Sequence, residues 1–202
     1  MGWSLADFCR IIFYQKERGR RPKGEKMSSK TEERIKALDV ALNNELRERD
    51  FYLKHKERTI NPLGKLMFTS IASDEDEHYR RILELQKKLS KEGKWPETVP
   101  LIVKGTEVKS IIQKLVGSVD TSSKADLDDM KAVQIAIDFE AKGEMFYGNL
   151  AKSVEDPVEK KFYDLLASIE REHRLSLEDT YEYFQDPAGW YRIKERHHID
   201  GA

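Results

Sequence analysis

Residues 73–78 read Ser-Asp-Glu-Asp-Glu-His and place a carboxylate, Glu75, three residues before an imidazole, His78. In an α-helix of about 3.6 residues per turn, side chains three apart lie on one face. The pair carries little information by itself, because Glu195 and His198 have the same spacing near the end of the chain, where we give them no role.

The pair recurs at Glu170 and His173, 95 residues further along the chain. The same offset relates other landmarks, which are Glu45 and Glu140, Phe51-Tyr52 and Phe146-Tyr147, Asn61-Pro62 and Asp156-Pro157, and Ala72-Ser73 and Ala167-Ser168. No insertion interrupts the match between these landmarks. The sequence therefore predicts one helical hairpin that occurs twice, and an all-α bundle of four helices.

The composition is typical of a soluble protein built from long helices, with 36 % charged and 39 % hydrophobic residues and little Gly or Pro. A chain of 202 residues can form one domain with a sizeable core. The net charge of −1 gives no general attraction to nucleic acid. The single cysteine, Cys9, excludes an internal disulfide framework and favours a reducing compartment. No apolar run reaches the roughly 18 residues of a membrane span.

Residues 1–27 differ from the rest of the chain. Apolar residues come first and a basic run from Lys16 to Lys26 follows, which is the reverse of the order in a signal peptide. One interpretation is an amphipathic arm that touches a membrane surface or a partner. The other, which we favour, is a disordered or non-native extension ahead of a natural start at Met27.

Capping residues and helical periodicity predict four helices within residues 28–185. Ser29 and Glu32 fit a capping box at the start of the first helix. Asn61-Pro62 ends that helix and begins the next. The expected helices run from about 28 to 60, 62 to 91, 123 to 154 and 157 to 184. In the tail, residues 186–202, we expect the aromatic side chains to pack on the bundle or on a neighbouring subunit.

A long connection, residues 92–122, separates the two hairpins. Trp95-Pro96 and Val99-Pro100 indicate extended chain, and the apolar spacing in 104–116 indicates a short helix. Such a connection is long enough to travel the length of a bundle. We expect this crossover to let the third helix begin at the same end as the first.

The spacing of the repeated landmarks puts the carboxylates at one height in the bundle. Glu45 lies 16 residues before Asn61, and Glu75 lies 14 residues after it. At a rise of about 1.5 Å per residue, both lie roughly 20 Å from the turn. The second hairpin repeats this spacing. Two such hairpins would bring six side chains to one layer, which are Glu45, Glu75, His78, Glu140, Glu170 and His173.

Four buried carboxylates in one layer are costly unless they are paired, protonated or bound to metal. Their four negative charges balance two divalent cations. Carboxylates with imidazoles suit iron or manganese and leave positions for oxygen or peroxide. The alternative is that these Glu side chains lie on solvated helix faces, as most do. The recurrence of the whole set at one offset favours the metal site.

The rubrerythrin branch of the ferritin-like superfamily has a ligand pattern that this chain resembles at Glu45, Glu75-x-x-His78, Glu140 and Glu170-x-x-His173. The resemblance covers roughly residues 28–185. It implies a ferritin-like four-helix bundle that holds two iron ions, with manganese or zinc as other metals. The implied chemistry is reduction of hydrogen peroxide or oxygen, as in defence against oxidative stress, or oxidation of iron.

By the same resemblance, Tyr52 and its repeat mate Tyr147 lie beside the ligands, and ordinary core aromatics are the alternative. Two features depart from the family. The chain lacks the two Cys-x-x-Cys pairs of a rubredoxin-like domain, so electrons would come from a separate donor. Gly143 stands where the family usually has a further glutamate. Glu144, or Glu48 at the mirrored position, would supply the extra carboxylate, and the more common alternative is that both are surface charges.

Three functions fit this pattern. The first is a non-haem di-iron oxidoreductase that reduces hydrogen peroxide or oxygen with electrons from an external donor. The second is a ferroxidase or another iron-handling protein. The third is an interaction module whose metal site is relict or filled by zinc. We favour the first, in the cytoplasm and as a homodimer or larger assembly, with no nucleic-acid partner and no membrane span.

Overall fold

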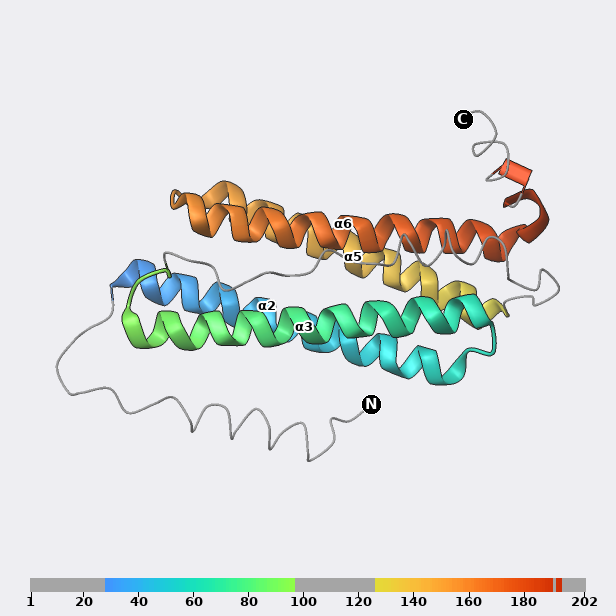
Figure 1. The fold of residues 1–202 in the computed structure, drawn as a ribbon, viewed down its shortest axis with the longest axis horizontal. Helices are drawn as coiled ribbons and strands as arrows, with labels where there is room; N and C mark the ends of the chain where they lie inside the picture. Colours follow the sequence, from blue (N-terminus) through green and yellow to red (C-terminus); the bar gives the residue numbers. More distant parts are fainter. Residues whose placement is uncertain (1–27, 97–125, 191, 194–202) are drawn as a thin grey trace.

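The computed structural model describes residues 28–96, 126–190 and 192–193. Four long helices make up most of these residues: α2 (Ser29–Arg58), α3 (Pro62–Glu92), α5 (Leu127–Ser153) and α6 (Pro157–Gln185). This described part contains no strand. Figure 1 shows α2 and α3 as one antiparallel hairpin and α5 and α6 as another, lying against each other. The prediction of an all-α protein with paired helices is confirmed.

The start of each hairpin's second helix follows the predicted capping pattern. The Asn61 side chain accepts a hydrogen bond from the backbone N–H of Gly64, and Pro62 occupies the first turn of α3. Asp156 caps α6 in the same way, ahead of Pro157. These caps satisfy N–H groups that have no partner inside the helix, and proline has no N–H to satisfy there. Both hairpin turns are therefore fixed by short sequence motifs.

The first helix begins near Ser28-Ser29 as predicted, but its predicted cap and the predicted start of the third helix are wrong. Ser28, and not Ser29, caps α2, because the backbone of Ser28 is extended and its hydroxyl accepts from the N–H of Thr31. The third helix does not begin near residue 123. The side chain of Asp126 accepts from the N–H of Asp129 at 2.7 Å, and this extended residue places the first helical residue of α5 at position 127.

The expected direction of the third helix is also wrong, because α5 begins where α2 ends. Arg58, the last residue of α2, pairs with Asp128 at 3.1 Å and with Asp129 at 3.0 Å in the first turn of α5. Lys30, at the start of α2, pairs with Glu155, just beyond the end of α5. The two helices are therefore antiparallel.

The reason lies in the path of the first hairpin. Helix α3 returns the chain to the end where α2 begins, and α5 begins at the opposite end (Figure 1). The expected short helix at 104–116 lies outside the described residues. With α2 and α5 antiparallel, the two hairpins are related by an approximate twofold axis across the bundle.

Two apolar clusters fill the bundle, one on each side of a polar layer. The first combines the early part of α2 and the late part of α3 with the late part of α5 and the early part of α6, and includes Leu38, Leu42, Ile82, Leu85, Tyr147, Phe162 and Leu166. The second combines the remaining halves, and includes Tyr52, Met67, Phe68, Ile71, Val133, Leu177 and Tyr183. The repeat thus places the same layer at mid-length in all four helices.

The ends of the chain are described only in part. Trp190 packs edge-to-face on Tyr183, with 5.5 Å between ring centroids, and its indole N–H donates to Asp179. The arm at 1–27, Tyr191 and residues 194–202 lie outside the described residues. None of the described helices has the length and apolar character needed to cross a membrane.

Candidate metal centre

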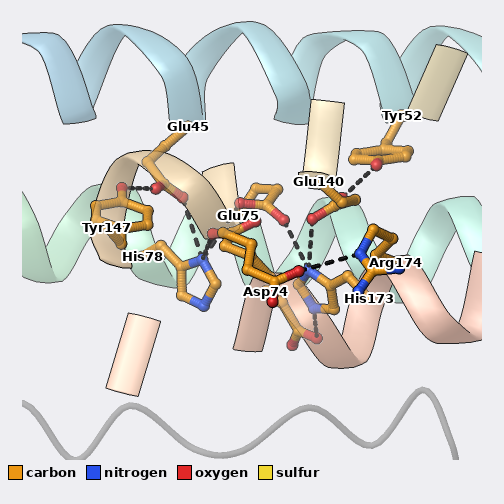
Figure 2. Close-up of polar contacts among 11 residues, drawn as sticks. Glu45, Tyr52, Asp74, Glu75, His78, Glu140, Tyr147, His173 and Arg174 are labelled. Carbon is orange, nitrogen blue, oxygen red and sulfur yellow. Dashed lines mark hydrogen bonds and ion pairs between the residues drawn. The ribbon is translucent and has the colours of Figure 1, made fainter. Parts of the chain in front are cut away.

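The polar layer consists of the six side chains that the repeat predicts, one or two from each helix. Figure 2 labels all of them except Glu170. Each of them is at most 1 % exposed. Helix α2 supplies Glu45, α3 supplies Glu75 and His78, α5 supplies Glu140, and α6 supplies Glu170 and His173. The Glu-x-x-His spacing puts both members of a pair on the inner face of one helix. The structure brings all six together.

The six side chains form two overlapping groups of donors. One group contains Glu45, Glu75, His78 and Glu170, and the other contains Glu75, Glu140, Glu170 and His173. Within each group the donor atoms lie within 4.8 Å of one another. We call these groups the His78 half and the His173 half. Glu75 and Glu170 belong to both halves and therefore lie between them.

Both histidines turn Nδ1 towards the carboxylates. Nδ1 of His78 lies 3.1 Å from Glu45 Oε2 and 3.2 Å from Glu75 Oε2. Nδ1 of His173 lies 3.1 Å from Glu75 Oε1 and 3.4 Å from Glu140 Oε2. The two rings are nearly parallel, with centroids 6.0 Å apart. The same ring nitrogen is thus presented to the centre from each hairpin.

Several of these buried atoms make no hydrogen bond with any residue that the structure describes. They are Glu75 Oε1, Glu140 Oε2, both carboxylate oxygens of Glu170, and Nδ1 of His173. Nδ1 of His173 is close to Glu75 Oε1, but the two are not oriented as donor and acceptor. A buried polar atom without a partner costs about 1–3 kcal/mol, and a charged one costs more. A cation bound among these donors would satisfy them, so the residues fit a metal ion.

The two predicted tyrosines cross between the hairpins. The Tyr52 hydroxyl, on α2, donates a hydrogen bond to Glu140 Oε1 on α5. The Tyr147 hydroxyl, on α5, donates to Glu45 Oε1 on α2. Each tyrosine therefore holds one carboxylate oxygen of the opposite hairpin and leaves the other oxygen facing the histidine (Figure 2). Both are fully buried core aromatics as well.

Burial and neighbouring charges shift the pKa values of three carboxylates, Glu45 and Glu170 upwards and Glu75 downwards. Burial, with help from Glu75, raises the pKa of Glu45 to about 8. Burial and the charge of Glu75 also raise the pKa of Glu170 well above its usual value. Burial alone would raise the pKa of Glu75, but His78 and His173 outweigh it and hold that pKa below the usual range. Glu75 is therefore the carboxylate whose ionised form the two histidines stabilise.

The pKa values of both histidines in the layer are raised. Burial lowers the pKa of His78, but the carboxylates of Glu75 and Glu45 raise it further, to about 10. Burial likewise opposes the charged form of His173, while Glu140 and Asp74 raise its pKa well above its usual value. The metal-free layer thus retains protons at neutral pH. A cation would replace these protons, because metal ligands must give them up.

The two candidates for an extra carboxylate lie in different places. Glu144 is half-buried and accepts a hydrogen bond from Arg174 at 3.0 Å. Glu48 is buried, and burial followed by the charges of Glu75 and Glu140 raises its pKa well above the usual value. Glu48 therefore adjoins the polar layer and Glu144 does not.

The Glu170 side chain lies close to the backbone at Gly143. A Cβ atom at this position would lie 3.0 Å from Glu170 Oε2 and 3.2 Å from its Cδ. Any side chain here would push against Glu170 in its present position. The absence of a glutamate at 143 thus agrees with the way Glu170 enters the layer.

Sequence reasoning missed Asp74. Its Oδ2 lies 3.1 Å from Nε2 of His173, on the side of the ring away from the carboxylates (Figure 2). Asp74 stands next to Glu75 in an acidic run, so its residue type did not distinguish it from the other acidic residues there. The offset of 95 residues pairs it with Ile169, and a search for repeated polar residues passes over it.

No family model, no curated protein and no solved structure matches this chain. The case for a function therefore depends on the geometry of the polar layer.

Proposed function

We propose that this chain is a ferritin-like, non-haem di-iron oxidoreductase of rubrerythrin type. In this proposal it reduces hydrogen peroxide or oxygen with electrons from a separate donor. The observation that carries the proposal is the pair of overlapping donor groups, which share Glu75 and Glu170 and contain buried atoms without partners. Two adjoining groups that share two carboxylates are the arrangement of a dinuclear centre.

The roles of the six residues follow from their positions. Glu45 and His78 would hold one cation, and Glu140 and His173 would hold the other. Glu75 and Glu170 would bridge the two. The four carboxylates would balance the charge of two divalent cations. Iron bound in this way supplies the exchange of electrons with peroxide or oxygen.

The protein's own groups position ligands and hold protons around the centre. Tyr52 and Tyr147 fix the outer oxygens of Glu140 and Glu45, so each inner oxygen points into the layer. Burial, and then the neighbouring carboxylates, raise the pKa of both tyrosines well above their usual value, so both keep their protons at neutral pH. The apolar clusters above and below keep bulk water from the layer.

One observation favours a second candidate, a ferroxidase. The sequence has a single cysteine and so no cysteine-held iron to feed electrons to the layer. Oxidation of ferrous iron as substrate needs no such donor, because the iron itself supplies the electrons. The same six residues would serve this reaction.

Reduction kinetics separate the two candidates. The full chain is loaded with ferrous iron without oxygen, and peroxide consumption is followed with and without an excess of a small reductant. Many turnovers per chain with the reductant support the oxidoreductase. Oxidation that stops when the added ferrous iron is used up supports the ferroxidase. If the iron-loaded protein is inert to both peroxide and oxygen, both proposals fail. The control variant is Glu144→Ala, which should react like the unaltered chain.

A further inference from the structure

The two halves of the polar layer are related by the sequence repeat, but two of their neighbours differ. Asp74 in the first hairpin corresponds to Ile169 in the second, and Glu48 corresponds to Gly143. Both differences replace a carboxylate by a residue without a polar side chain. A carboxylate that supports one half and not the other makes the two halves chemically unequal.

Asp74 acts on the His173 half. Its Oδ2 lies 3.1 Å from Nε2 of His173, whose Nδ1 faces the carboxylates. The ring can therefore offer one nitrogen to a cation while the other nitrogen donates its proton to Asp74. Such a carboxylate partner fixes the orientation of a metal-binding histidine and makes it a stronger ligand.

Among the described residues, none gives His78 an equivalent support. The position that mirrors Asp74 is Ile169, a hydrocarbon side chain that is itself buried. Across 28–96 and 126–190, no residue accepts a hydrogen bond from Nε2 of His78; only its Nδ1 is bonded, to Glu45 and Glu75. The orientation of this ring depends on packing and on the ligands themselves.

Glu48 is a second carboxylate without a counterpart in the repeat. It lies one turn after Glu45 on α2 and is buried. At the mirrored position, a Cβ atom on Gly143 would lie 3.0 Å from Glu170 Oε2, so a side chain there would press on Glu170. The first hairpin thus has a buried carboxylate at this position and the second hairpin has none.

We propose that the two halves bind cations with unequal affinity, so that the His173 half fills first and the His78 half fills second. Asp74 is the positioning residue that sets this order. This inference rests on the proposed dinuclear centre and adds the order of loading. It makes a form with one cation per chain a stable species at intermediate metal concentration.

The test is a titration of the metal-free full chain with Mn²⁺, followed by calorimetry and by electron paramagnetic resonance. The expected result is two binding steps, with an isolated Mn²⁺ spectrum after the first and a coupled two-ion spectrum only during the second. His173→Ala should lose the tighter step, and His78→Ala should retain it. These two variants assign each step to one half.

Asp74→Ile gives the His173 half the residue that the other half already has. We expect it to weaken the tighter step by about 10–100-fold and to leave the weaker step nearly unchanged. Asp74→Asn, which keeps the shape and an acceptor oxygen, should weaken it less. Asp76→Ile is the control, because Asp76 lies on the same helix but pairs with Arg49 and Arg80 on the surface.

The possible failures are distinguishable. Absence of Mn²⁺ binding to the unaltered chain would overturn the dinuclear centre itself. Coupled two-ion spectra from the first addition, or two equal steps, would overturn the order of loading while the centre stands. An Asp74→Ile variant that folds and keeps its tighter step unchanged would also overturn it, and Asp74→Asn supplies the same comparison if Asp74→Ile does not fold.

Discussion

The polar layer and the two apolar clusters are built by the same four helices, yet they affect stability in opposite ways. Leu38 and Leu85 are fully buried and stabilise the bundle by removing hydrocarbon from water. Glu75 and Glu170 are buried just as deeply, but oxygens of both have no hydrogen-bond partner among the described residues. A layer that weakens the metal-free bundle has a purpose other than holding the helices together. The apolar clusters hold the helices together, and the polar layer is the part of the bundle that we expect to bind a ligand.

The largest expected effect on stability comes from the apolar clusters. Leu85→Ala leaves a cavity in the first cluster and should lower the free energy of unfolding by about 2–5 kcal/mol. Denaturant titration of the metal-free protein measures this loss. Leu127→Ala, at a side chain that is 76 % exposed, should change stability by less than about 0.5 kcal/mol. Because the layer is separate from the cluster, folded Leu85→Ala should bind as much metal as the unaltered chain, and a lower content would contradict that separation.

A bound cation should reverse the cost of the layer. At a metal concentration about 100 times the dissociation constant, binding to the folded state alone adds about 3 kcal/mol. For a chain of this size the melting temperature should rise by about 5–10 °C. Thermal unfolding with and without Mn²⁺ checks this rise. Glu170→Ala removes a carboxylate shared by both halves and should show little or no rise; a full rise in that variant would place the binding elsewhere.

The pH dependence should differ between the metal-free and metal-loaded forms. In the metal-free form the pKa of Glu45 is about 8 and that of His78 about 10, both above their ordinary values of 4.5 and 6.5. The stability from each group is complete below its ordinary pKa and is lost as the pH rises through the raised one. The lowered pKa of Glu75 acts only below pH 4.5. The melting temperature of the metal-free protein should therefore fall between about pH 5 and pH 9.

Metal binding should follow the opposite trend. Each proton displaced by a cation makes the apparent affinity rise about tenfold per pH unit while that group is protonated. We expect the metal to be lost on dialysis at about pH 5 and held at about pH 8. Metal content after dialysis at the two pH values measures this, and equal contents would contradict the proton competition.

The smallest expected effect is on metal affinity, and it comes from the tyrosine hydroxyls that bond to carboxylates of the layer. Tyr147→Phe removes the hydroxyl that holds Glu45 Oε1 and keeps the buried ring. Metal affinity of the His78 half should fall by about tenfold, with little change in folding. Tyr163→Phe is the matched control, since Tyr163 stacks on Tyr147 within the first cluster. A fall of equal size in both variants would show that packing, and not the hydrogen bond, is responsible.

The sequence predicts the members of the layer better than their surroundings. The offset of 95 residues identifies all six side chains, because the repeat preserves both residue type and height along the helices. The same periodicity does not choose between Glu48 and Glu144. They lie three residues after Glu45 and four after Glu140, and both spacings return to one helix face. Packing decides between them, and it places Glu144 on Arg174.

Other features depend on information that a repeat does not contain. The repeat does not identify Asp74, because its partner, His173, lies in the other hairpin and the residue at the corresponding position, Ile169, is apolar. The direction of α5 follows from the path of the chain, and the ion pairs of Arg58 reveal it only in the folded bundle. Ser28 and Ser29 are identical neighbours, so their type does not say which one caps α2.

The most direct measurement is the metal content of the purified full chain after incubation with excess ferrous iron or Mn²⁺ and removal of the unbound metal. We expect about two ions per chain, the number that two adjoining donor groups hold. Glu75→Ala, which alters both halves, should retain far less metal and still fold as a helical bundle. An unaltered chain that retains no metal, with the same stability in the Glu75→Ala variant, would contradict the assignment of the polar layer as a metal centre.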